Sequence, residues 1–125
     1  MGDGSRAVRW WRAALLAALV GITALALIPQ PEVPITTSWD KSDHLLAFFV
    51  LALLAERAFP RQPFWRWLAP ALLAYGGALE IFQYFTPSRF AAWSDLAADA
   101  IGIALYGGLR RWLPGALRPS APAAE

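Results

Sequence analysis

The sequence predicts an all-α membrane protein, a bundle of four transmembrane helices with the N and C termini in the cytoplasm. Of its 125 residues, 58% are hydrophobic and 16% are charged, and the mean hydropathy is +0.41. A soluble domain carries about a quarter charged residues, so the apolar excess indicates lipid rather than water around the chain. Four apolar segments are separated by turns rich in proline and charge, and nine of the eleven Lys and Arg residues fall on one side of them. Such an asymmetry is typical of multi-pass membrane proteins.

The chain starts with a polar segment, residues 1–12, which we expect to lie in the cytoplasm. The first predicted helix, about residues 13–28, is apolar throughout. With Trp10 and Trp11 counted in, it approaches the roughly 20 residues that span about 30 Å of hydrocarbon. A basic start, an apolar run and the small residues around 24–26 also fit a cleaved signal peptide. We favour a retained helix, because the paired tryptophans suit a membrane interface.

Three further helices are predicted at about residues 43–57, 66–86 and 90–112, so that residues 13–113 form the transmembrane domain. Proline-containing segments precede the second and third helices. Proline ends a helix because it lacks a backbone N–H and its ring clashes with the preceding turn. The tail, residues 114–125, is rich in Ala and Pro and has no face to bury, so we expect it to be disordered.

The basic residues and the tryptophans predict the same orientation. The nine basic residues expected in the cytoplasm are Arg6, Arg9, Arg12, Arg57, Arg61, Arg66, Arg110, Arg111 and Arg118. The two expected outside are Lys41 and Arg89. All seven tryptophans fall at predicted interfaces, the inner one for Trp10, Trp11, Trp65, Trp67 and Trp112 and the outer one for Trp39 and Trp93. We therefore expect a multi-pass protein of the cell inner (cytoplasmic) membrane.

Polar residues interrupt the last two predicted helices, where a lipid-facing helix carries none. They are Glu80, Gln83, Asp95 and Asp99. A carboxylate near the centre of a membrane helix costs about 2.5–3.5 kcal/mol, so each needs a partner or a proton. With the turn between the helices centred after Pro87, antiparallel geometry places Glu80 level with Asp95, and Asp99 level with Gly76.

Helical spacing gathers these residues on two faces. The first face comprises Glu80, Gln83 and Tyr84, and the second comprises Asp95, Asp99, Gly102 and Tyr106. We expect the two faces to be buried against each other. His44 and Lys41 at the entrance to the second helix, and Arg89 in the turn, are expected at the same outer end.

This cluster supplies the candidate functional residues. The candidate catalytic residues are Glu80, Asp95 and His44, and the candidate ligand-binding residues are Arg89, Lys41, Asp40, Gln83 and Asp99. Two carboxylates at one depth repel each other, so one of them should hold a proton, which suits general acid–base chemistry. A structural interpretation stands beside this one: the carboxylates pair with basic residues, and His44 bonds to Asp40.

Four short motifs, in order, resemble the VanZ-like family. They are D-K-x-x-H at Asp40–His44, E-x-x-Q at Glu80–Gln83, P-x-R at Pro87–Arg89 and D-x-x-x-D-x-x-G at Asp95–Gly102. The resemblance covers about residues 40–108, and Asp99 stands where many members have Asn. It implies a small bacterial integral membrane protein without a defined reaction. The name-giving member raises tolerance to teicoplanin-type glycopeptides, which bind cell-wall precursors.

Several classes of chemistry are excluded or disfavoured. The chain has no cysteine, which excludes disulfides, thiolate catalysis and cysteine-based metal sites. His44 is the single histidine and has no supporting ligand motif, so no metal is predicted. No cofactor motif is present, and basic residues occur singly or in pairs between apolar runs, unlike a nucleic-acid surface. The predicted partners are the lipid bilayer and a lipid-linked or anionic ligand of the envelope.

The leading functional hypothesis is therefore a membrane-embedded site at the outer face that acts on or binds a component of the cell envelope. The rival hypothesis is a non-enzymatic assembly or accessory protein whose polar cluster holds four helices in register. A proton or ion pathway is the third, and it is disfavoured because polar residues thin out toward the cytoplasmic half of every predicted helix.

Overall fold

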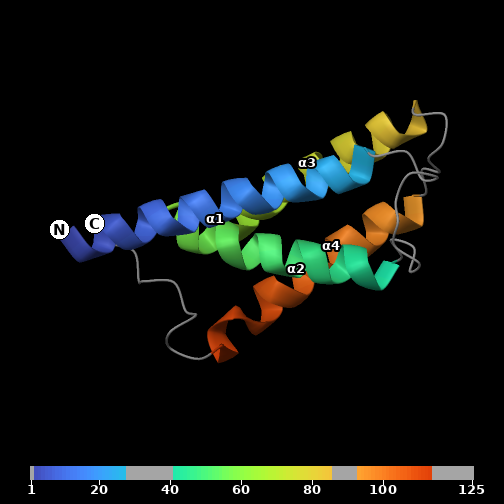
Figure 1. The fold of residues 1–125 in the computed structure, drawn as a ribbon. Coiled ribbons are helices and arrows are strands. Elements are labelled where there is room, and N and C mark those ends of the chain that lie inside the picture. The colour runs from blue at the N-terminus through green and yellow to red at the C-terminus, as the bar shows by residue number, and fades with distance from the viewer. Residues whose placement is uncertain (1, 28–40, 86–92, 114–125) are drawn as a thin grey trace.

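The computed structural model describes residues 2–27, 41–85 and 93–113, and it confirms an all-helical fold in this part of the chain. Its four α-helices are α1 (Gly2–Leu27), α2 (Lys41–Ala58), α3 (Ala69–Tyr84) and α4 (Trp93–Leu109) (Figure 1). A π-helical turn, η2 (Phe64–Leu68), leads into α3, and a 3-10 turn, η3 (Arg110–Trp112), follows α4. The predicted disordered tail, residues 114–125, and the turn around Pro87 lie outside the described residues.

The first helix begins much earlier than the sequence predicted, because residues 2–12 are helical rather than a polar extension. Its first turns pack against the end of α2. Arg12 donates a hydrogen bond from Nε to the carbonyl of Ala58 (2.9 Å) and lies over the Phe59 ring (4.8 Å). Arg57 in turn lies over the Trp11 ring (4.9 Å). These tertiary contacts stabilise the additional turns, since most helical stability in proteins comes from packing.

The other predicted helices shift by a few residues. The second starts at Lys41 rather than 43, with Asp43 in its first turn, where an acidic side chain favours the helix dipole. The predicted helix 66–86 divides into η2 and α3. Pro70 lies in the first turn of α3 and offers no N–H, and the N–H of Ala69 bonds to the carbonyl of Phe64 in the wider π pattern.

The helix α2 is the centre of the bundle, with α4 and α1 as its main neighbours. The sequence predicted that α3 and α4 pack against each other, and they do, but α4 contacts α2 more extensively than α3. Gly102 explains the preference. A Cβ at this position would lie 2.3 Å from the backbone oxygen of Leu45, so the backbones of α4 and α2 touch where glycine leaves room.

Long-range contacts sort the helix ends into two groups. The arginine-rich end joins the first turns of α1 to the last turns of α2 and α4, through the contacts of Arg12 with Ala58 and of Glu56 with Arg110. The histidine end joins the first turns of α2 and α4, through His44 and Asp99, to the last turns of α1 and α3. Consecutive helices therefore run up and down, as predicted.

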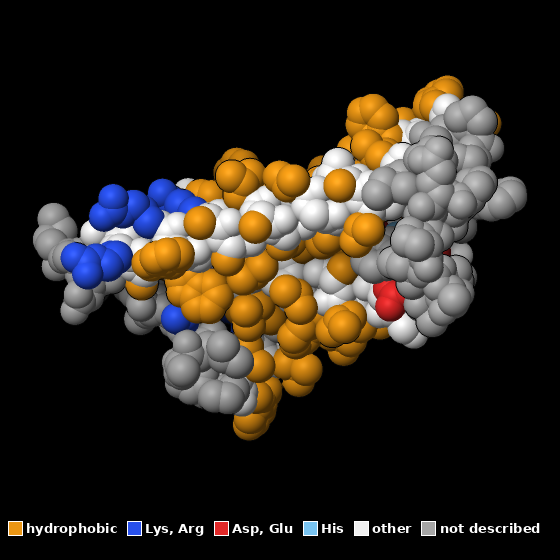
Figure 2. Space-filling model, in the orientation of Figure 1, with side chains coloured by type: hydrophobic (Ala, Val, Ile, Leu, Met, Phe, Trp, Pro, Cys, Tyr) orange, Lys and Arg blue, Asp and Glu red, His pale blue; other side chains and the backbone are white. Residues whose placement is uncertain are grey.

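One helix of the described residues, Gly4–Leu27, is long and apolar enough to cross a membrane, and 11% of its apolar 18-residue window is buried. By themselves α3 and α4 have 16 and 17 residues, fewer than the roughly 20 that a span requires. Figure 2 shows Lys and Arg side chains gathered where α1 begins, and hydrophobic side chains along the length of the bundle.

Candidate functional site

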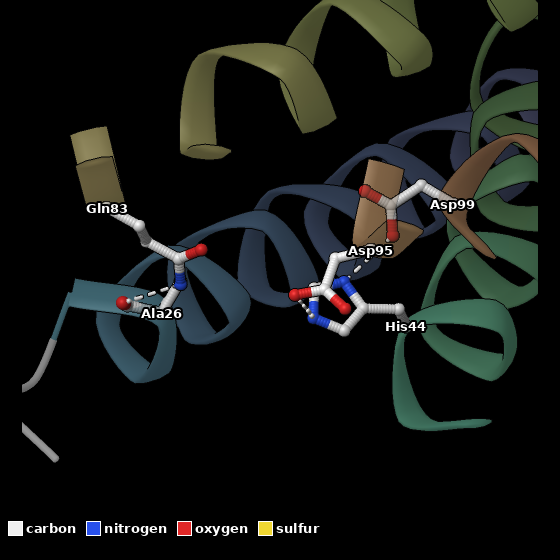
Figure 3. Close-up of polar contacts among 5 residues, drawn as sticks. All are labelled: Ala26, His44, Gln83, Asp95 and Asp99. Atoms are coloured by element: carbon white, nitrogen blue, oxygen red, sulfur yellow. Dashed lines mark hydrogen bonds and ion pairs between the residues drawn. The ribbon is translucent and has the colours of Figure 1, made fainter. Parts of the chain in front are cut away.

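The candidate site is centred on His44, which lies in the first turn of α2 and is 7% exposed. Its Nδ1 is 2.9 Å from Oδ1 of Asp99 on α4 (Figure 3). Asp99 is still more deeply buried, at 2% exposed. A buried carboxylate is costly without a hydrogen-bond donor, and the imidazole N–H supplies one. The Asp40 partner suggested by the sequence lies outside the described residues.

A second carboxylate faces the other ring nitrogen of the imidazole. Oδ2 of Asp95, one helical turn before Asp99 on α4, is 3.9 Å from Nε2 of His44. This separation is too long for a hydrogen bond but permits a strong electrostatic contact. The side chain of Asp95 is 18% exposed, against 2% for Asp99. The two acids therefore differ: Asp99 is the enclosed partner of His44, and Asp95 is the one that the surroundings can reach.

The helix α3 covers one side of the site, and its Gly76 lies beside Asp99, as the sequence predicted. A Cβ built on Gly76 would lie 2.8 Å from Oδ2 of Asp99, so these two residues share a level and glycine leaves room for the carboxylate. Phe48 of α2 occupies the other side of this space, 3.2 Å from the same position. Glu80, one turn further along α3, is 4% exposed and interacts electrostatically with His44. Two carboxylates thus contact the imidazole, and a third adds to the negative potential at the ring.

Gln83 and Tyr84, predicted on the same face as Glu80, have different positions. Gln83 is 4% exposed and donates from Nε2 to the carbonyl of Ala26 in the last turn of α1 (3.0 Å), away from His44 (Figure 3). It therefore satisfies a free helix-end carbonyl rather than facing a ligand. Tyr84 is 75% exposed. The expectation that it is buried with Glu80 is wrong.

Three predicted ligand-binding residues cannot be placed in the site. Asp40 and Arg89 lie outside the described residues, and of Lys41 the structure gives the helix position but not the side chain. Within the described residues, no three His, Asp or Glu side chains are arranged to hold a metal ion.

A second buried polar cluster, at the arginine-rich end, was missed by the sequence analysis. Glu56 of α2 is 3% exposed and accepts a hydrogen bond from the Tyr106 hydroxyl (2.6 Å). Arg110 donates to the same carboxylate from Nε (2.9 Å) and from a terminal nitrogen, and lies over the Phe64 ring (5.6 Å). The expectation that polar residues thin out toward this end is wrong. One feature of the sequence could have indicated this cluster. Tyr106 shares a predicted buried helix face with Asp95 and Asp99, and a buried tyrosine hydroxyl needs a hydrogen-bond partner.

The arrangement at His44 permits proton exchange. When Nδ1–H donates to Asp99, the ring is held in one orientation and one tautomer, and Nε2 becomes the basic nitrogen. Nε2 faces Asp95, the more exposed carboxylate. An imidazole between an orienting acid and an accessible acid resembles the acid–base pairs of enzymes in its geometry. It can also hold a positive charge that Asp95, Asp99 and Glu80 stabilise.

Comparison with known proteins identifies no related sequence or structure. No family model matches the chain, and no curated protein or solved structure is significantly similar to it. What the site can do therefore follows from its own side chains.

Proposed function

We propose that this chain is a VanZ-like protein that crosses the cytoplasmic membrane four times, and that its His44 site at the outer face binds or acts on a component of the cell envelope. The observation that supports the function most directly is the His44 imidazole, held between Asp99 at 2.9 Å and Asp95 at 3.9 Å. The motifs of the resemblance contain all three residues.

The surface of the bundle supports the membrane placement. Large apolar side chains are exposed on every helix, among them Leu16 and Val20 on α1, Leu46 on α2, Ile81 and Phe82 on α3, and Ile101 on α4. Soluble monomers rarely expose continuous apolar surface of more than a few hundred Å2. Exposed tryptophans flank this surface near the helix ends, at Trp10, Trp65, Trp67, Trp93 and Trp112. That pattern fits lipid around the middle and an aromatic belt at each interface.

The orientation follows from the arginines. Every Arg side chain in the described residues belongs to the arginine-rich end, which the positive-inside rule assigns to the cytoplasm. The histidine end then faces outward, at the depth of lipid headgroups. There, Nε2 of His44 and the carboxylate of Asp95 would take or give a proton on a hydroxyl or phosphate of a lipid-linked envelope component. Lys41 and Arg89, if they complete the site, would bind its anionic groups.

The test is expression in a sensitive bacterial host, with surface binding of a teicoplanin-type glycopeptide as the readout. Asp95→Asn removes the accessible acid with little change in shape, and His44→Gln removes the base. We expect both variants to accumulate in the membrane near the wild-type level and to lose most of the protection. Asp43→Asn is the comparison variant: it makes the same change in the first turn of α2, at the residue before His44. Variants that accumulate and protect as well as the wild type would overturn the functional role.

A non-enzymatic assembly or accessory role is the second candidate, and the enclosure of Asp99 favours it. That carboxylate is 2% exposed and lies against His44 and the Gly76 backbone. Among the described residues, no fully buried side-chain nitrogen or oxygen lacks a hydrogen-bond partner. A polar cluster satisfied in this way can hold helices in register. In that case His44→Gln removes folded protein from the membrane, whereas an active-site role leaves the protein level intact.

A further inference from the structure

A cleft of about 580 Å3 lies at the arginine-rich end, far from His44. It lies between the first turns of α1 and the turn that follows α2. Its polar lining comprises Ser5, Arg9, Arg12, Arg61 and Gln62. Neither the His44 site nor the Glu56 cluster contributes to this lining. The cleft is therefore a separate feature of the molecule.

The described residues that line the cleft carry charge of one sign. Three of them are arginines, and none of those described is acidic. Arg9 and Arg61 are exposed, so their side chains keep contact with the medium. Arg12 is exposed too, but its guanidinium is fixed by the Ala58 carbonyl and the Phe59 ring. The bond from Nε leaves the terminal nitrogens of Arg12 as donors, in a planar fork that matches the oxygens of a phosphate.

The remaining lining is apolar, from Val8, Phe59 and Pro60. Phe59 itself is 38% exposed, so this apolar lining is open to the surroundings. A basic group beside apolar surface is the combination expected where a headgroup meets its acyl chains. Basic pockets between transmembrane helices on the cytoplasmic side bind the headgroups of anionic lipids.

We propose that this cleft binds the phosphate headgroup of an anionic diacyl phospholipid from the inner leaflet, with its acyl chains along the apolar lining formed by Val8, Phe59 and Pro60. The inference rests on the membrane placement proposed above, but not on any role of His44. Arg12 holds the phosphate close to the end of α2, and Arg9 and Arg61 close over it from the two sides of the cleft. Bound lipid would thereby join α1 to the turn after α2.

The experiment uses the full chain purified in a neutral detergent. Short-chain phosphatidylglycerol, short-chain phosphatidylcholine and inorganic phosphate are titrated separately, and the thermal unfolding midpoint is followed. A ligand that binds the folded state raises the midpoint, by an amount that grows with the logarithm of its concentration above Kd. We expect phosphatidylglycerol to raise it at concentrations where the other two do not. An equal effect of phosphatidylcholine, or of free phosphate, would overturn the proposal.

The variants test which arginines bind. Arg9→Gln and Arg61→Gln each remove one exposed charge to which no helix-to-helix contact is assigned, so both should fold. We expect each to weaken phosphatidylglycerol binding about tenfold, the value of one hydrogen-bonded charge pair. Arg66→Gln is the matched control, since Arg66 is exposed at the same end but outside the cleft. Equal losses in all three would indicate diffuse attraction and refute a built site.

A further variant separates this proposal from the function proposed for His44. Asp95→Asn should leave the phosphatidylglycerol shift unchanged while abolishing glycopeptide protection. Conversely, Arg9→Gln with Arg61→Gln should abolish the shift, whether or not the His44 site proves functional. If phosphatidylglycerol no longer raised the thermal midpoint of Asp95→Asn, the cleft would not be independent of the histidine end.

Discussion

At the scale of single residues, two buried carboxylates lie against specific donors. Asp99 has the imidazole of His44, and Glu56 has both the Tyr106 hydroxyl and the Arg110 guanidinium. The pairing is needed because a buried carboxylate without partners is strongly destabilising. The two arrangements differ in chemistry. The Glu56 cluster is closed by a permanent cation, whereas His44 can gain or lose a proton, and this makes the histidine end the better candidate for function.

Tyr106 gives the first stability prediction. Tyr106→Phe keeps the ring, which is fully buried between Phe49 and Phe64, and removes only the hydroxyl that donates to Glu56. Because hydrogen bonds to charged groups are worth about 1.5–3 kcal/mol, we expect a loss of that order in unfolding free energy. The measurement is denaturant unfolding in detergent. Tyr84→Phe, at a tyrosine that is 75% exposed, is the control and should unfold like the wild type. A Tyr106→Phe protein as stable as the control would show that the bond contributes nothing.

At the scale of helices, α1 is tied to the bundle along its whole length. Its first turns bond to α2 through Arg12, its middle to α3 through Thr23 and Tyr75 (2.6 Å), and its last turn to α3 through Gln83. The carbonyl that Gln83 contacts belongs to Ala26, within the small residues that also fit a signal-peptide cleavage site. Cleavage there would remove all of these contacts. The packing therefore supports α1 as a retained helix of the proposed membrane domain.

The contact between α2 and α4 depends on Gly102. Gly102→Ala would drive a methyl group against the backbone of Leu45, and backbone cannot move aside as a side chain can. Overpacking of this kind costs about 1–3 kcal/mol, so the thermal midpoint in detergent should fall. Gly108→Ala is the matched control on the same helix, because nothing lies within 4 Å of its added Cβ. If both variants melt together, the close approach of α2 and α4 is not what holds the bundle.

At the scale of the whole molecule, the two ends have different character. One end gathers the arginines, the proposed lipid cleft and the Glu56 cluster; the other gathers His44, Asp95, Asp99 and Glu80. Apolar surface lies between them. In a membrane this polarity sets the orientation, because translocating the arginines is disfavoured.

The topology gives the last prediction. Reporter fusions at Arg61 and in the tail, residues 114–125, should read as cytoplasmic, and a fusion in the connector, residues 29–39, should read as external. The physical reason is the collection of arginines at one end of an up-and-down bundle. A cytoplasmic connector would place His44 on the inner face and refute the proposed access to the envelope.

Much of this arrangement was predictable from local regularities. Composition and the long apolar segments predicted an all-helical chain, and the i, i+3, i+7 spacing predicted that Asp99, Gly102 and Tyr106 share a buried face. Two antiparallel helices rise equally per residue, so residues equally far from the turn lie side by side. This predicted that Gly76 and Asp99 lie at the same depth in the bundle. These properties depend on one helix, or on two helices joined by a short turn. The four membrane spans and their orientation stay predictions.

Tertiary structure alone decided which helices meet. A helical pattern specifies which face is buried but not which neighbour buries it, so nothing local could show that α4 packs on α2 more than on α3. His44 is paired with Asp99 across 55 residues of sequence, and Glu56 with Arg110 across 54. The N-terminal arginines are part of α1, and Arg12 among them donates a hydrogen bond to Ala58 at the end of α2. Pairing over such separations depends on how all the helices pack together, and only the folded chain contains that information.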